Sequence, residues 1–123
     1  MKKFLFLLLL SSQVVMADDT IPEIDHTGWE ITYYGNTYKT PRKTASGERF
    51  DMNALTCASM AHPFGTKLKV VNPKNGKSAV VRVTDRGRFG KKQLDLTYGA
   101  FGKIANHRDG RVKVHVYRIV EGK

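Results

Sequence analysis

The sequence has a single cysteine, Cys57, among its 123 residues. One thiol cannot form a disulfide within the chain, so the fold must depend on its apolar core. A lone thiol is most simply a small buried residue; a nucleophile or a bridge to a second molecule are the alternatives. The four histidines lack the close spacing of metal ligands. The sequence therefore predicts no metal site and no cofactor.

Long apolar runs and phosphate-binding glycine motifs are also missing. The run from residue 4 to 10 is too short to cross a bilayer, and neither common phosphate loop is present, which argues against nucleotide binding. A basic start, a short apolar middle and small residues up to Ala17 are typical of a secretory signal peptide. We expect residues 1–17 to be removed near Ala17, which leaves a periplasmic or secreted protein without a membrane anchor. The alternative is a buried N-terminal helix.

Acidic residues are scarce outside one segment. The net charge is +10, yet residues 18–30 hold five acids and no Lys or Arg. The basic remainder favours a polyanionic partner, which could be nucleic acid, anionic lipid or an acidic polymer of the cell wall. An exported protein rarely meets nucleic acid, so the wall polymer is the expected partner. Residues 18–27 show no hydrophobic period and are predicted to form a flexible acidic leader.

Alternating apolar and polar residues predict strands at five places: 28–35, 66–72, 78–84, 93–96 and 111–120. Asn75-Gly76 predicts a tight turn, so the second and third of these strands form a hairpin. The Thr97 hydroxyl can cap a short helix that runs from Tyr98 to about Ala105. Residues 44–60 show no clean strand pattern and are expected to form turns. Short strands and one short helix predict a single all-β domain, a small barrel or sandwich, over residues 28–123.

Two stretches contain the residues that could act in catalysis or binding. Residues 44–51 place Glu48 and Asp51 three residues apart beside the turn-forming Ser46-Gly47, and residues 83–87 end an apolar strand with Asp85. A strand that alternates Val with Lys has no structural need for an acid at its end, which indicates a site. The structural alternative for Asp85 is pairing with Arg86 or capping of backbone amides.

These stretches resemble the rare-lipoprotein-A-like domain, the double-psi β-barrel of septal-ring lytic transglycosylases, which is related to expansins. The resemblance extends in family order over roughly residues 30–120 and rests on these matching segments: Tyr34-Gly35, residues 44–51, Leu55-Thr56, Pro63-Phe64-Gly65-Thr66, Val70, Asn72, Asn75-Gly76, Val81-Arg82-Val83, Asp85-Arg86-Gly87, Phe89 and Asp95-Leu96.

The resemblance implies a six-stranded double-psi β-barrel with a sugar-binding groove. Enzymes of this family cleave the glycan strands of peptidoglycan without water and leave 1,6-anhydro-muramic acid ends. Asp85 matches the essential acid of related barrels, and Glu48 and Asp51 match two other acids of the groove. The sequence departs from the family where Ser59 replaces the usual histidine and where Arg88 replaces a common proline.

Non-hydrolytic cleavage needs an acid that protonates the leaving oxygen and then accepts the proton of the attacking hydroxyl. For Asp85 to fill both roles its pKa must rise through burial or a neighbouring like charge, for which Glu48 is the candidate. The residues expected to contact the glycan strands are Tyr34, Ser46, Asp51, Ser59 and Arg86. We therefore expect a monomeric lytic transglycosylase; the alternative is a non-catalytic, expansin-like module that binds peptidoglycan.

Overall fold

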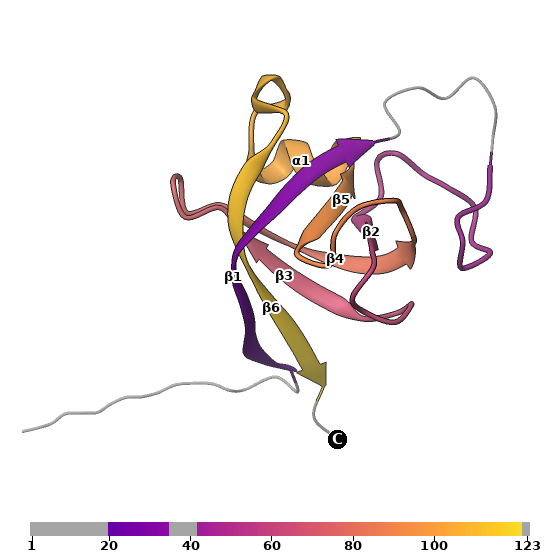
Figure 1. Ribbon diagram of the computed structural model, residues 1–123, viewed down its shortest axis with the longest axis horizontal. Helices are drawn as coiled ribbons and strands as arrows, with labels where there is room; N and C mark the ends of the chain where they lie inside the picture. Colours follow the sequence, from indigo (N-terminus) through magenta and orange to yellow (C-terminus); the bar gives the residue numbers. More distant parts are fainter. Residues whose placement is uncertain (1–19, 35–41, 122–123) are drawn as a thin grey trace, which may run out of the picture.

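The computed structural model describes residues 20–34 and 42–121 (Figure 1). Six strands close into a barrel in the order β1-β5-β2-β4-β3-β6, which confirms the predicted all-β barrel with one short α-helix. The elements are β1 (Thr20–Tyr34), β2 (Thr56–Ser59), β3 (Lys67–Val71), β4 (Ser78–Asp85), β5 (Gln93–Thr97), α1 (Tyr98–Ile104), the 3-10 turn η1 (His107–Asp109) and β6 (Val112–Glu121).

Two of the strand pairs are parallel and the others are antiparallel. β1 runs parallel to β5 and β2 runs parallel to β4, whereas β3 and β4 form the predicted antiparallel hairpin. A parallel pair needs a crossover connection, so each parallel pair joins strands that lie far apart in the sequence. Because β2 runs parallel to β4 and antiparallel to β5, the C-terminal end of β4 lies level with the middle of β5.

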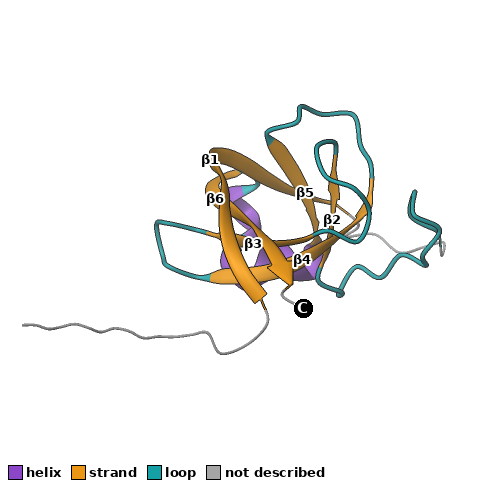
Figure 2. Ribbon diagram, turned by 90° about the horizontal axis from the view of Figure 1, so that it is seen from below, coloured by secondary structure: helices purple, strands orange, loops and turns teal. Residues whose placement is uncertain are grey.

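The barrel interior is filled by the inward residues of every strand and by one face of α1. Leu94 and Leu96 on β5, and Val81 and Val83 on β4, are fully buried because alternate residues of a strand point to the same side. Phe101 of α1 is fully buried in the same core, and Figure 2 shows the helix packed against the strands. The predicted cap is confirmed, since the Thr97 hydroxyl accepts a hydrogen bond from the Ala100 amide.

The prediction of a flexible leader is wrong from Thr20 onward. Residues 20–27 form the first half of β1 and pair with β6, from Thr20 opposite Glu121 to Thr27 opposite His115. Backbone pairing with the strongly alternating β6 supplies the order that the segment's own sequence does not signal. Over this half β1 pairs with β6 alone, because its pairing with β5 begins only at Glu30; a proline, here Pro22, is accepted in such an edge segment. The predicted signal peptide lies outside the described residues.

The strand β2 was not predicted. Its four residues, Thr56–Ser59, are all buried, since β2 lies between β4 and β5 and is covered on both faces. A strand buried on both faces lacks the alternation by which strands are recognised in a sequence. Cys57 lies on β2 and is fully buried, in agreement with the simplest reading of the lone thiol.

Candidate functional site

A β-bulge in β4 decides where Asp85 lies. Cys57 on β2 is opposite Val83, but the next β2 residue, Ala58, is opposite Asp85, so Thr84 is an extra residue without a β2 partner. Strict alternation would place Asp85 on the same side as the core residue Val83. The extra residue reverses this, as bulges do, and turns Asp85 to the outer face of the barrel.

Asp95 reaches the same outer face from β5. It lies between the core residues Leu94 and Leu96, and it is opposite Ala58, so the small Ala58 side chain separates Asp95 from Asp85. On the far side of Asp95, Thr32 of β1 is its register partner. Four adjacent strands thus present Thr32, Asp95, Ala58 and Asp85 side by side, a set that we call the acidic row.

Asp85 is held by hydrogen-bond donors from three parts of the chain. Its Oδ1 accepts from the backbone amides of Ala45 and Arg86, both at 2.9 Å. Its Oδ2 accepts from the Tyr34 hydroxyl at 3.3 Å and from the Arg42 guanidinium at 3.5 Å. Asp85 therefore organises the site: it fixes the loop around Ala45 against the end of β4, which joins the two stretches that the sequence had singled out.

Asp95 differs from Asp85 in having few hydrogen-bond donors around it. It is partly buried, and its Oδ1 accepts one hydrogen bond from the Thr32 hydroxyl at 2.8 Å. Burial raises the pKa of Asp95; the Thr32 hydrogen bond acts against that rise, and the negative charge of Asp85 adds to it. A carboxylic acid that keeps its proton more readily than usual, next to a second acid, is the arrangement expected of a proton donor. The sequence interpretation had not assigned Asp95 to the site, and its register against Ala58 could not be read from the chain.

Glu48 does not serve as the like charge beside Asp85. Arg82 engages both of its carboxylate oxygens, and the Oε1 contact measures 2.9 Å. These hydrogen bonds, with the charge of Arg82, hold the pKa of Glu48 below its ordinary value. Arg82 is opposite Thr56 and Asp85 is opposite Ala58, two residues further along β2, so Arg82 and Asp85 share the outer face. Glu48 therefore lies over the same face as the acidic row, at a different position along β4.

Two of the residues expected to contact the glycan, Ser46 and Asp51, make hydrogen bonds within turns. The Ser46 hydroxyl lies 2.9 Å from that of Thr44, inside the hairpin closed by the bridge between Lys43 and Arg49. Asp51 is exposed, and its carboxylate accepts from the amide of Asn53.

The expected substrate contact of Ser59 has no support in the structure. Ser59 is 0% exposed, and its hydroxyl accepts from the amides of Ala61 and His62, which fixes the turn that follows β2. The residue at the place of the family histidine is thus a structural one.

Aromatic rings and arginines flank Asp85 on two sides. On one side, Arg42 lies over the rings of Tyr34 and Phe50, at 5.6 and 4.6 Å from their centres. The pKa of the Tyr34 hydroxyl is raised, chiefly by burial and then by the charge of Asp85. On the other side, Arg86 lies over the ring of Phe64 at 4.0 Å. Phe64 is 42% exposed, whereas Tyr34, the aromatic residue expected to contact the glycan, is partly buried.

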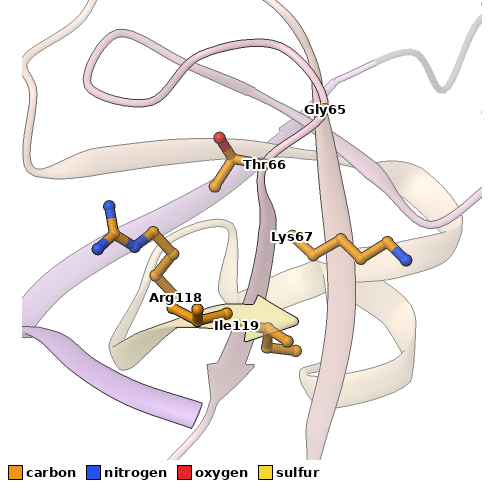
Figure 3. A pocket seen from close by; sticks show the side chains of 6 residues that line it. Gly65, Thr66, Lys67, Arg118 and Ile119 are labelled. Carbon is orange, nitrogen blue, oxygen red and sulfur yellow. The ribbon is translucent and has the colours of Figure 1, made fainter. Parts of the chain in front are cut away.

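A separate hollow of about 480 Å³ opens between the start of β3 and the end of β6 (Figure 3). It is lined by Gly65, Thr66, Lys67, Arg118, Ile119 and Val120, and none of the predicted site residues borders it. Among the described residues, no three His, Cys, Asp or Glu side chains converge as a metal site would require. Within the same residues, no helix combines the length and apolar character needed to cross a bilayer.

The closed barrel with two parallel pairs places the chain among the double-psi β-barrels. Two solved structures share this fold. The Streptomyces papain inhibitor superposes with a TM-score of 0.61 at 22% identity, over 80% of this chain and 97% of the inhibitor. The expansin of Clavibacter michiganensis gives the same TM-score and identity, over 79% of this chain and 51% of the expansin. At this identity the similarity concerns the fold alone.

The sequence comparison is more specific. Residues 27–116 match the family model described as "Lytic transglycolase", which is most of the chain, and the chain belongs to this family.

Two relatives illustrate the range of similarity. A protein of Synechocystis sp. (strain PCC 6803), named "Probable endolytic peptidoglycan transglycosylase RlpA", is 53% identical over 84 residues, which cover 68% of this chain and 26% of the relative. The "Endolytic peptidoglycan transglycosylase RlpA" of Neisseria meningitidis serogroup A is 39% identical over 104 residues, which cover 84% of this chain and 43% of the relative. The chain thus spans less than half the length of either relative.

Proposed function

We propose that the protein is an exported lytic transglycosylase that cleaves the glycan strands of peptidoglycan and leaves 1,6-anhydro-muramic acid ends. The proposal is supported by the family, by the relatives named peptidoglycan transglycosylases and, above all, by the acidic row. Asp85 and Asp95 lie two strand spacings apart, about 9 to 10 Å between backbones. Both side chains face the same side of the sheet, with the buried Ala58 between them.

Asp95 and Asp85 have different catalytic roles, which follow from their different surroundings. Asp95, whose pKa is raised, donates its proton to the glycosidic oxygen as the bond from the anomeric carbon to that oxygen breaks. The muramic acid 6-hydroxyl attacks the anomeric carbon and gives its proton to the carboxylate of Asp85. The negative charge of Asp85 also stabilises the positive charge that develops on the sugar ring. One proton leaves the 6-hydroxyl and one reaches the leaving oxygen, so the reaction consumes no water.

The remaining predicted residues support this pair. Tyr34 and Arg86 orient Asp85 by donating hydrogen bonds to it, Arg86 through its backbone amide. Glu48, held by Arg82 on the same face, contacts the sugar chain beyond Asp85 in this proposal. Ser46 shapes the loop at this end of β4, where its amide donates to the Thr84 carbonyl, and Asp51 shapes the following turn at Asn53.

The experiment that tests this function is digestion of purified sacculi followed by mass spectrometry of the soluble products. Fragments with anhydro ends are expected from the protein and not from Asp85→Asn or Asp95→Asn. Fragments with ordinary reducing ends would mean hydrolysis and would refute the lytic mechanism. N-terminal sequencing of the protein from the producing cell tests export, for which we expect cleavage near Ala17.

A second function is favoured by one observation. The position of the family histidine holds Ser59, which is buried and engaged in a turn. A barrel without that histidine can retain the sugar-binding face and lack cleavage, as an expansin-like binding module would. Co-sedimentation of the protein with sacculi, without release of soluble products after long incubation, would select this function over the first.

A further inference from the structure

We propose that Phe64, with Arg86 stacked on it, forms a platform that binds a sugar unit of the glycan strand next to the acidic row. This inference rests on the proposed glycan substrate and adds a binding position to it. The platform was not expected from the sequence, which favoured Tyr34 as the aromatic contact.

The position of the platform is set by the strand that carries Asp85. The turn Pro63–Thr66 is closed by a hydrogen bond from the Thr66 amide to the Pro63 carbonyl, and Gly65 adopts a positive φ of 91° within it. The amide of Gly65 also donates to the carbonyl of Val83, at 2.8 Å. Phe64 is thereby fixed beside the end of β4, where Asp85 follows Val83 by two residues.

Arg86 makes this aromatic surface rigid. Its guanidinium carbon lies 4.0 Å from the centre of the Phe64 ring, and its Nη1 donates to the carbonyls of Ser59 and Asp85 at 3.0 and 3.3 Å. Two carbonyls and a ring therefore fix the orientation of an otherwise exposed arginine. A guanidinium carries five N–H donors, and among the described residues no acceptor engages those on Nε and Nη2.

The exposure of the Phe64 ring is the feature that indicates a binding surface. A phenylalanine in so small a barrel is expected in the core, as Phe101 is, yet Phe64 remains 42% exposed on an anchored turn. A flat apolar ring beside fixed N–H donors suits the apolar face of a sugar ring that also carries hydroxyl or carboxylate groups. Muramic acid units of peptidoglycan have both features, through the ring and the acids of the lactyl group and attached peptide.

The ring is tested by Phe64→Ala, with Phe64→Trp as the conservative variant and Val80→Ala as the control. Val80 has a similar exposure of 40% and lies five residues before Asp85 on β4. Binding to sacculi is measured in an Asp95→Asn background, so that cleavage does not change the ligand. We expect Phe64→Ala to weaken binding about five- to tenfold, with Phe64→Trp and Val80→Ala near the parent. In the cleaving protein, Phe64→Ala should raise KM and leave kcat nearly unchanged.

The guanidinium is tested by comparing two glycan probes. Arg86→Gln should weaken binding to peptidoglycan strands by a larger factor than binding to a neutral N-acetylglucosamine oligomer, because only the first loses a charged contact as well as the stacked support of the ring. Strands from which the peptides have been removed then distinguish the acids: retained sensitivity to Arg86→Gln assigns the contact to the lactyl carboxylate, and lost sensitivity assigns it to the peptide.

The outcomes separate this inference from the proposed function. Equal binding by Phe64→Ala and the parent overturns the platform, even where anhydro products are formed. Weakened binding by Phe64→Ala without any anhydro products supports the platform and refutes the lytic activity. Failure of the parent protein to bind any of these glycans overturns both.

Discussion

Replacing Asp95 with asparagine should abolish cleavage without destabilising the fold. Asparagine has nearly the same shape, and its Oδ1 can still accept the hydrogen bond that the Thr32 hydroxyl now gives to Asp95. Its amide protons are not acidic enough to be transferred to a glycosidic oxygen. Loss of a general acid typically slows a reaction about 10²- to 10⁴-fold, which corresponds to about 2.7 to 5.5 kcal/mol of transition-state stabilisation.

The stability of the same variant has a predictable pH dependence. The pKa of Asp95 in the folded protein lies above its ordinary value of 3.8, so the folded state binds more protons than the unfolded state between these two values. The free energy of unfolding contributed by Asp95 therefore falls as pH rises through that window. Asparagine does not titrate, so Asp95→Asn should equal or exceed the parent in stability at pH 7 and lose that advantage below pH 3.8.

Two measurements check this prediction. Initial rates of anhydro-product release give the activity, and urea unfolding at pH 3 and pH 7 gives the stability. Asp109→Asn is the matched control, because Asp109 is an exposed acid in η1 that lies outside the acidic row. Cleavage by Asp95→Asn within about threefold of the parent rate would refute the proton-donor role. A large loss of stability at pH 7 would refute the reasoning on the burial of its charge.

Three further predictions concern the scaffold. A Cβ added at Gly99 would lie 2.9 Å from a backbone atom of Asn53, so Gly99→Ala should cost about 1 to 3 kcal/mol in chemical unfolding, whereas Gly90→Ala, which has open space around it, should cost little; equal effects would contradict the close approach. Thr97→Ala removes the helix cap and should cost about 1 to 2 kcal/mol by the same measurement, and an unchanged midpoint would show that the cap is dispensable. Burial raises the pKa of the Cys57 thiol, so a thiol reagent such as DTNB should label the folded protein far more slowly than the urea-unfolded protein, and rapid labelling of the folded state would contradict its burial.

Local sequence pattern was sufficient to predict most of the elements of the barrel. The hairpin of β3 and β4, the strand β5, the Thr97 cap and the later part of β1 follow from alternation and turn chemistry, which depend on residues near one another in the chain. The same rules failed for β2, which is buried on both faces and so does not alternate. They also failed for residues 20–27, which are ordered by pairing with β6, far away in the sequence.

The site also combines features that the sequence predicts with features that depend on the pairing of distant strands. The sequence by itself indicated a site at Asp85 and in the loop of residues 44–51. The acids in that loop, beside a glycine turn, and the acid at the end of an apolar strand have no evident structural role. Only the tertiary structure decided which acids face each other. The bulge at Thr84 turns Asp85 outward, the register of β2 places Asp95 and not Glu48 across from it, and Arg82 takes up Glu48. A one-residue shift in register exchanges the two faces of a strand, and no local pattern records such a shift.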